Sequence, residues 1–205
     1  MARPAPTTAD VVRISTTSGS VSVLAEPGRT EMWSSVALVA DGAGPFTVDG
    51  GSSNVRVRVP EGTDVVIGST SGKVVANGRL GSVSALSTSG KVSVEEARSV
   101  DARSTSGRVV VGHADGDCRV VSTSGRVEVG RCGAVDASSG SGRVVVSDAH
   151  GPVRANCISG KISVSLAGAH DVVADTVSGR IEISLPAGVD PLVVESASDI
   201  VGSAA

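Results

Sequence analysis

One short phrase, Ser-Gly followed by a basic residue and then Val or Ile, returns along most of this chain of 205 residues. Typical copies are "STSGKVSV", which begins at Ser87, and "STSGRVVV", which begins at Ser104. With the glycine of each copy as position zero, seven copies follow one another at intervals of 17 to 19 residues, and an eighth lies upstream. These glycines are Gly19, Gly72, Gly90, Gly107, Gly125, Gly142, Gly160 and Gly179. A repeat of this length indicates one structural unit that stacks on the next.

Apolar and polar residues alternate within every copy. Positions +2 and +4 after the glycine are Val, Ile or, once, Ala, and positions −7 and −5 are Val, Ala, Ile or Cys. This period of two predicts two short strands per repeat. The sequence therefore predicts an all-β fold, a single right-handed parallel β-solenoid of about ten turns of 17–19 residues. At ~4.8 Å per turn the rod is about 48 Å long.

A left-handed helix of hexapeptides is the main alternative for a repeat of this length, and it requires an apolar residue at every sixth position. Position +8, where that pattern continues, is polar or Gly in the four consecutive copies from Gly90 to Gly142, which argues against the hexapeptide helix. These residues are Arg98, Asp115, Gly133 and His150.

The domain prediction is a disordered arm over residues 1–8, a β-solenoid over 9–200 and a short tail over 201–205. The 53 residues between Gly19 and Gly72 equal three average turns, so we expect three turns there in chain order. One of these is "FTVDGGSSNVRVRV", and "WSSVAL" is a candidate for another. The repeat is least regular around Trp33, where we expect a cap on the solenoid.

Composition limits what the core of this solenoid contains. The chain has one Trp, one Phe and no Tyr, so Val, Ala, Ile and Ser have to fill a narrow interior. All three cysteines, Cys118, Cys132 and Cys157, occupy positions that are apolar or small in other copies. We expect them to be small core residues. The glycine at position zero suits a corner that needs positive φ, so all eight glycines are predicted structural turn residues.

The tandem pattern "[ST]-x-SG-[KR]-[VI]-x-[VI]" resembles a bacterial β-strand-repeat family that is labelled as an adhesin and is a domain of unknown function. The resemblance covers residues 10–200 and implies a β-helix without catalytic residues. Some members of that family are similar to surface or envelope proteins with export signals or anchors. The turn length also resembles that of bactofilins, which are cytoplasmic β-helical polymers; this likeness concerns architecture alone.

Position +1 is basic in all seven consecutive copies. We call this column the cationic ridge: Lys73, Lys91, Arg108, Arg126, Arg143, Lys161 and Arg180. Like charges ~4.8 Å apart repel unless acids or a polyanion neutralise them, and at position +3 only Glu128 and Glu182 are acidic. The ridge predicts binding to an acidic protein or an anionic polymer. The alternative is a solvated face that prevents aggregation of a flat strand.

Other partner classes have less support. The formal net charge is −3, and no aromatic residues alternate with the ridge, so we expect no specific nucleic-acid binding. The N-terminal stretch "MARPAPTTAD" has no apolar segment typical of a signal peptide, and no run approaches the ~18 apolar residues of a membrane span. We therefore expect a cytoplasmic location, and association with a surface stays open.

No residue group indicates a cofactor, a metal or catalysis. His113, His150 and His170 lie on turn segments at different offsets, so we expect no metal site. Glu95 and Glu96 fit a solvated corner pair better than an acid–base pair. Threonine at position −2 returns in four consecutive copies, which is too narrow for an ice-binding face. These residues are Thr70, Thr88, Thr105 and Thr123.

Val75, Val110 and Val145 recur at position +3 in every second turn. This stripe either contacts a partner or a second copy, or reflects β-propensity alone. Our prediction is a non-catalytic, adhesin-like interaction or scaffold module that binds a partner or polyanion along its side. One alternative is a self-assembling scaffold that stacks end to end, as bactofilins do. A minor alternative is a polysaccharide-active β-helix enzyme.

Overall fold

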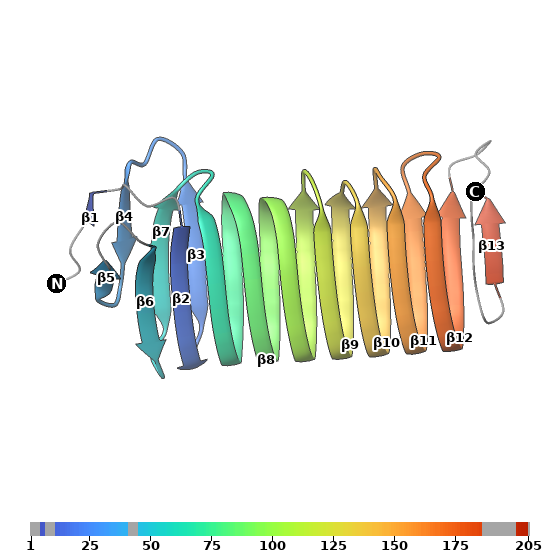
Figure 1. Ribbon diagram of the computed structural model, residues 1–205, viewed down its shortest axis with the longest axis horizontal. Coiled ribbons are helices and arrows are strands. Elements are labelled where there is room, and N and C mark those ends of the chain that lie inside the picture. Colours follow the sequence, from blue (N-terminus) through green and yellow to red (C-terminus); the bar gives the residue numbers. More distant parts are fainter. Residues whose placement is uncertain (1–4, 7–10, 41–44, 186–199, 205) are drawn as a thin grey trace.

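The computed structural model describes residues 5–6, 11–40, 45–185 and 200–204, and these residues form strands and turns with no helix. The strands pair into one sheet that winds into a rod, with β1 and β13 at opposite ends (Figure 1). The strands are β1 (Ala5–Pro6), β2 (Val11–Ser18), β3 (Val21–Glu26), β4 (Glu31–Ser34), β5 (Leu38–Ala40), β6 (Phe46–Gly51), β7 (Val55–Pro60), β8 (Asp64–Ala114), β9 (Cys118–Cys132), β10 (Val135–Ala149), β11 (Val153–Leu166), β12 (Val172–Leu185) and β13 (Ile200–Ala204). The predicted β-solenoid is confirmed.

From β8 onward the turns follow one another in chain order. β8 through β12 pair in parallel, and equivalent positions of neighbouring copies face each other. Gly107 pairs with Gly125, and the same register joins the later corner glycines. We call each turn a rung and name it by its corner glycine. Because the register repeats, a residue type that recurs in the sequence becomes a continuous column along the rod.

The Ser-Gly corner, where the two arms of a rung meet, has room for glycine alone at position zero. Gly107 has φ +139°, which L side chains rarely adopt. A Cβ added to Gly107 would overlap the carbonyl oxygen of Gly90 on the preceding rung. Each later corner glycine meets its predecessor in the same way. The repeated glycine is therefore required by the close stacking of backbone on backbone.

The core is a narrow interior filled from alternate positions of both arms, as the two-residue period predicts. Its apolar residues form one continuous cluster of mainly Val and Ala along the rod. At the far side from the Ser-Gly corner is a second bend, the opposite corner, lined inside by small residues such as Ala97, Ala114 and Cys132. The three cysteines are buried and free, which confirms their predicted place in the core.

The inside of the Ser-Gly corner is lined by hydroxyls. Position −3 holds buried Ser or Thr in all but one of the clear copies, the exception being Cys157. Thr16 Oγ1 donates to Ser69 Oγ at 3.3 Å. Four of these buried hydroxyls have no hydrogen-bond partner. They belong to Ser104, Ser122, Ser139 and Thr176.

The N-terminal rungs are not stacked in chain order, and our prediction of three sequential turns between Gly19 and Gly72 is wrong. β2 pairs in parallel with β8, so that Ser18 faces Ser71 and the Gly19 rung lies directly against the Gly72 rung. β6 and β7 stack on the other side of β2 and β3. The 53 residues between Gly19 and Gly72 match the length of three turns only by coincidence. Strand pairing depends on the apolar pattern, which β2 and β6 share.

The segment between these rungs forms a cap instead of the turn that we expected from "WSSVAL". β4 runs antiparallel to β7, with Trp33 facing Arg58, and β5 runs antiparallel to β6. The Arg58 guanidinium lies 5.7 Å from the centre of the Trp33 ring. β4 and β5 therefore lie along the outer edges of β7 and β6. This confirms the irregular region around Trp33 as a cap, where it blocks parallel continuation of the stack.

Part of each predicted end region forms a strand in the structure. Ala5–Pro6, within the predicted arm, pairs antiparallel with β4. β13, which includes most of the predicted tail, pairs in parallel with β12. The remaining arm residues and Ala205 lie outside the described residues. No helix capable of crossing a bilayer occurs in the described part of the chain.

Candidate binding site along the cationic corner

The structure aligns the predicted cationic ridge on consecutive rungs. Arg108 pairs with Arg126, Arg126 with Arg143, and the register continues to Lys161 and Arg180. The stacking of Gly72, Gly90 and Gly107 places Lys73 and Lys91 at the start of the same column. The ridge follows the outer side of the Ser-Gly corner, and its side chains are exposed or half-exposed.

Two acids neutralise part of the ridge. Glu128 accepts a hydrogen bond from Arg126 at 3.1 Å. Glu182 lies 2.6 Å from Lys161 and 3.9 Å from Arg180. The hydrogen bond from Lys161 lowers the pKa of Glu182, and the charges of Arg180 and Arg143 act in the same direction. The ridge cations of the Gly125, Gly160 and Gly179 rungs are therefore paired.

The remaining ridge cations form no ion pair with any described residue. They are Lys73, Lys91, Arg108 and Arg143. Position +3 of their rungs is Val or Ser, which cannot neutralise a cation. In these rungs the nearest outward acid on the same arm is Glu95, four residues or ~13 Å along the strand from Lys91. Its carboxylate accepts a hydrogen bond from the backbone N–H of Gly78 at 3.2 Å.

Hydroxyl columns lie beside the cations on the same corner. The serine at position −1 is exposed in every copy. Threonine at position −2 is also exposed and spans one rung more than the sequence predicted, because Thr17 stacks next to Thr70 once the Gly19 rung adjoins the Gly72 rung. From the Gly19 rung to the Gly125 rung, the corner is therefore an uninterrupted ladder of threonine and serine hydroxyls.

The opposite corner has charges of both signs. In register there, His113 faces Arg131 and Arg131 faces Asp148, whose carboxylate lies 3.6 Å from the Arg131 guanidinium. Asp148 also lies 3.1 Å from His150. Arg79 lies 3.4 Å from Asp115 and 3.6 Å from Glu96. Each cation of this corner therefore has an acid within reach, unlike those of the ridge.

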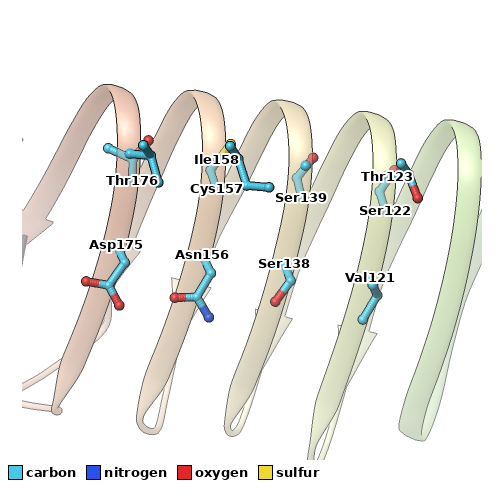
Figure 2. A pocket seen from close by; sticks show the side chains of 12 residues that line it. Val121, Ser122, Thr123, Ser138, Ser139, Asn156, Cys157, Ile158, Asp175 and Thr176 are labelled. Atoms are coloured by element: carbon cyan, nitrogen blue, oxygen red, sulfur yellow. The ribbon is translucent and has the colours of Figure 1, made fainter. Parts of the chain in front are cut away.

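A shallow groove lies beside the Ser-Gly corner on the arm that precedes it, across four rungs (Figure 2). Positions −4, −3 and −2 line it, including Ser122, Ser139 and Cys157. Ile158 and Val177, at position −2, are 63% and 75% exposed. Asp175 is the one carboxylate among the lining residues. The surface of the groove is mostly apolar. The groove adjoins the part of the ridge in which Glu128 and Glu182 pair with ridge cations.

The other candidates from the sequence do not converge. His113 and His150 each lie beside an aspartate of their own rung, at 3.3 and 3.1 Å, and on different rungs. No group of three or more His, Cys, Asp or Glu side chains in the described part of the chain is arranged to hold a metal ion. Val75, Val110 and Val145 are half-buried between the ridge and the centre of the arm.

Comparison with known proteins identifies a family for this chain but no individual relative. No curated protein matches the chain, and no solved structure does. Residues 29–199 match the Toastrack DUF4097 family, which extends over most of the solenoid. The match supports the repeat architecture and the unknown function that the sequence resemblance implied, and it does not include the adhesin label. The chain belongs to the Toastrack DUF4097 family, a domain of unknown function with a β-solenoid fold.

Proposed function

We propose that this Toastrack domain is a non-catalytic interaction module that binds an acidic partner or an anionic polymer along the cationic ridge. The observation behind the proposal is the run of Lys73, Lys91 and Arg108 on consecutive rungs, none of which forms an ion pair with an acid in the described part of the chain. Side chains ~4.8 Å apart lie well within the ~8 Å screening length at physiological salt. A bound polyanion removes that repulsion and gains attraction from every rung.

The acids beside the ridge favour a binding role over acid–base catalysis. Glu128 and Glu182 are held in ion pairs with ridge cations, and a catalytic carboxylate pair has to face a shared substrate. End-to-end assembly has less support than side binding. At the N-terminal end, β4 and β5 run antiparallel along the outer edges of β7 and β6, which hinders addition of a parallel rung.

The test compares two variants with the same loss of charge. In the first, Lys91, Arg108, Arg126 and Arg143 become Ser. In the second, four cations of the other arm become Ser: Arg13, Arg103, Arg119 and Arg154. Retention on an immobilised polyanion is measured over a series of salt concentrations, together with the molar mass by light scattering.

We expect the first variant to lose most retention and the second to stay close to the wild type. Equal losses would mean that net charge alone explains the binding, and the ridge would have no special role. Open-ended oligomers at high protein concentration and low salt would instead support the stacking alternative.

A further inference from the structure

The cationic ridge consists of two unlike parts. In the Gly72, Gly90 and Gly107 rungs the corner reads Thr-Ser-Gly followed by an unpaired cation. We call these three rungs the TSG tract. Its residues are Thr70, Ser71, Lys73, Thr88, Ser89, Lys91, Thr105, Ser106 and Arg108. In the Gly160 and Gly179 rungs, position −2 is Ile158 or Val177 and the cation is paired with Glu182. Between these two parts, the Gly125 rung has Thr123 with the paired Arg126, and the Gly142 rung has Gly140 with the unpaired Arg143. Threonine hydroxyls and unpaired cations therefore occur together on the three rungs of the TSG tract.

The hydroxyls of the TSG tract are available to a ligand. Thr70, Thr88 and Thr105 are exposed, and their hydroxyls have no hydrogen-bond partner among the described residues. Ser71 donates a long hydrogen bond, 3.4 Å, to the carbonyl oxygen of Thr17. The hydroxyls of Ser89 and Ser106 are exposed and unbonded within the described chain. Each rung thus offers two groups that donate and accept hydrogen bonds.

The side of the tract away from the hydroxyls is uncharged. Position +3 holds Val75, Ser93 and Val110, and the two valines are half-buried, with small apolar surfaces level with the strand. From one side of a rung to the other, a ligand therefore meets hydroxyls, then a cation, then a flat patch of small side chains. This order repeats every ~4.8 Å along the axis.

We propose that the TSG tract binds a linear acidic polysaccharide of the polyuronate type, laid along the solenoid axis. The inference rests on the proposed function of the ridge and adds the chemical class of its ligand. A uronate chain has a carboxylate, ring hydroxyls and apolar C–H surface in every unit. These match the cation, the hydroxyls and the valine or serine patch of one rung. Extended 1,4-linked units also rise by a distance similar to one rung.

Other polyanions match fewer of these groups. Single-stranded nucleic acid binds through aromatic stacking as well as charge, and the one Trp and one Phe of this chain lie in or beside the N-terminal cap. Polyphosphate has charge and acceptors and no apolar surface to place on Val75 and Val110. Polyglutamate has carboxylates and no hydroxyls to pair with the threonines. These polymers are therefore the comparison probes.

The experiment measures binding of the full chain to alginate oligosaccharides, polyglutamate, polyphosphate and single-stranded DNA of matched charge. The first variant changes Lys73, Lys91 and Arg108 to Ser. Its matched control changes the three paired cations of the same column, Arg126, Lys161 and Arg180, to Ser. A third variant changes Thr70, Thr88 and Thr105 to Val, which preserves side-chain shape and removes the hydroxyls. Far-UV circular dichroism checks that each variant is folded.

The expected result has three parts. The wild type binds alginate more tightly than the three other probes. The Lys73/Lys91/Arg108 variant loses at least tenfold in affinity for all polyanions, and its salt dependence falls by about 2 in slope, whereas the control loses less. The threonine-to-valine variant loses about tenfold for alginate and stays unchanged for polyglutamate, because it loses hydrogen bonds and no charge.

Failure of this inference differs from failure of the proposed function. If no polyanion binds, the ridge proposal is wrong. If the tract variant and the control lose equally, the TSG tract has no special role on the ridge and the polyuronate inference is overturned. If polyglutamate, polyphosphate or DNA binds as well as alginate and the threonine variant changes nothing, the ridge still binds polyanions and the polyuronate inference is overturned.

Discussion

The Ser-Gly corner and the opposite corner handle charge in different ways. In-register stacking places equivalent residues side by side, so any charge column repels itself unless its sign alternates. At the opposite corner both signs occur, with Arg131 next to Asp148 and Arg79 near Glu96. At the Ser-Gly corner seven cations follow one another, and acids pair with three of them. A column of charges can therefore be neutralised within this fold, yet most of the ridge cations have no acid partner among the described residues.

A glycine substitution at the Ser-Gly corner is expected to have the largest effect, because it combines backbone overlap with a positive φ. Gly107→Ala places a Cβ against the Gly90 carbonyl and a side chain at φ +139°. We expect a loss of at least ~3 kcal/mol in the free energy of unfolding, from strain and overlap together. The measurement is urea denaturation followed by circular dichroism.

Gly168→Ala is the matched control on the opposite side of the rod. Its added Cβ would lie 3.6 Å from His170 Nε2, an ordinary contact, and its φ is not positive. We expect a change within ~0.5 kcal/mol. Similar losses in both variants would show that glycine flexibility matters in general and that the Ser-Gly corner is not special.

The thiol inside the opposite corner predicts a dependence on pH. Burial, with a contribution from Asp148, raises the pKa of Cys132 from 9.0 to about 11. Because the folded state holds this proton more tightly, its contribution to stability is complete below pH 9 and is lost as the pH rises toward 11. In the wild type, the free energy of unfolding should fall between pH 8 and pH 11, and we expect Cys132→Ala to reduce this fall by up to ~2 kcal/mol. The measurement is denaturation at both pH values.

Cys157, inside the Ser-Gly corner, provides the comparison between the corners. Burial raises the pKa of its thiol too, whereas hydrogen bonds from the backbone at Ser159 and Gly142 lower it. We expect iodoacetamide to modify Cys157 before Cys132 in the folded protein, followed by mass spectrometry. The opposite order would contradict this assignment of backbone donors to the inside of the Ser-Gly corner.

The smallest expected effect comes from single charges at the two corners. Arg143 lies between Arg126 and Lys161 and forms no ion pair within the described residues, although its charge contributes to the lowered pKa of Glu182. Arg131, by contrast, lies 3.6 Å from Asp148. Arg143→Ser should raise stability by ~0.5 kcal/mol at low salt, and Arg131→Ser should lower it by a similar amount. Both differences should shrink at 1 M salt in a thermal melt. Shifts of the same sign in both variants would mean that the ridge does not repel itself.

The regular part of this fold could be predicted from sequence because one alignment of the copies determines the register. Gly107 pairs with Gly125 just as the column of glycines predicted, and Val109 with Val127. The stacking order before Gly72 could not be predicted in this way. β2 pairs with both β6 and β8, and residue spacing alone does not distinguish these neighbours from strands in chain order.

The residues that form the ridge could be predicted from the sequence, whereas their ion pairs could not. The column from Lys73 to Arg180 is visible in the sequence, and so are Glu128 and Glu182. Which cations these acids hold depends on side-chain geometry: Glu182 lies closer to Lys161 on the preceding rung than to Arg180 on its own rung. The addition of Thr17 to the threonine ladder depends on the stacking order. Recognising the TSG tract, where threonine hydroxyls lie beside unpaired cations, therefore required both the side-chain geometry and the stacking order.

The displaced N-terminal rung has a consequence for how the chain folds during synthesis. β2 and β3 leave the ribosome before both of their neighbours, because β6 with β7 and the start of β8 come later in the chain. These strands cannot complete their hydrogen bonds until about residue 77 has emerged, whereas each later rung can add directly to a finished surface. The start of this solenoid is therefore assembled as a block, and the rest extends from it one rung at a time.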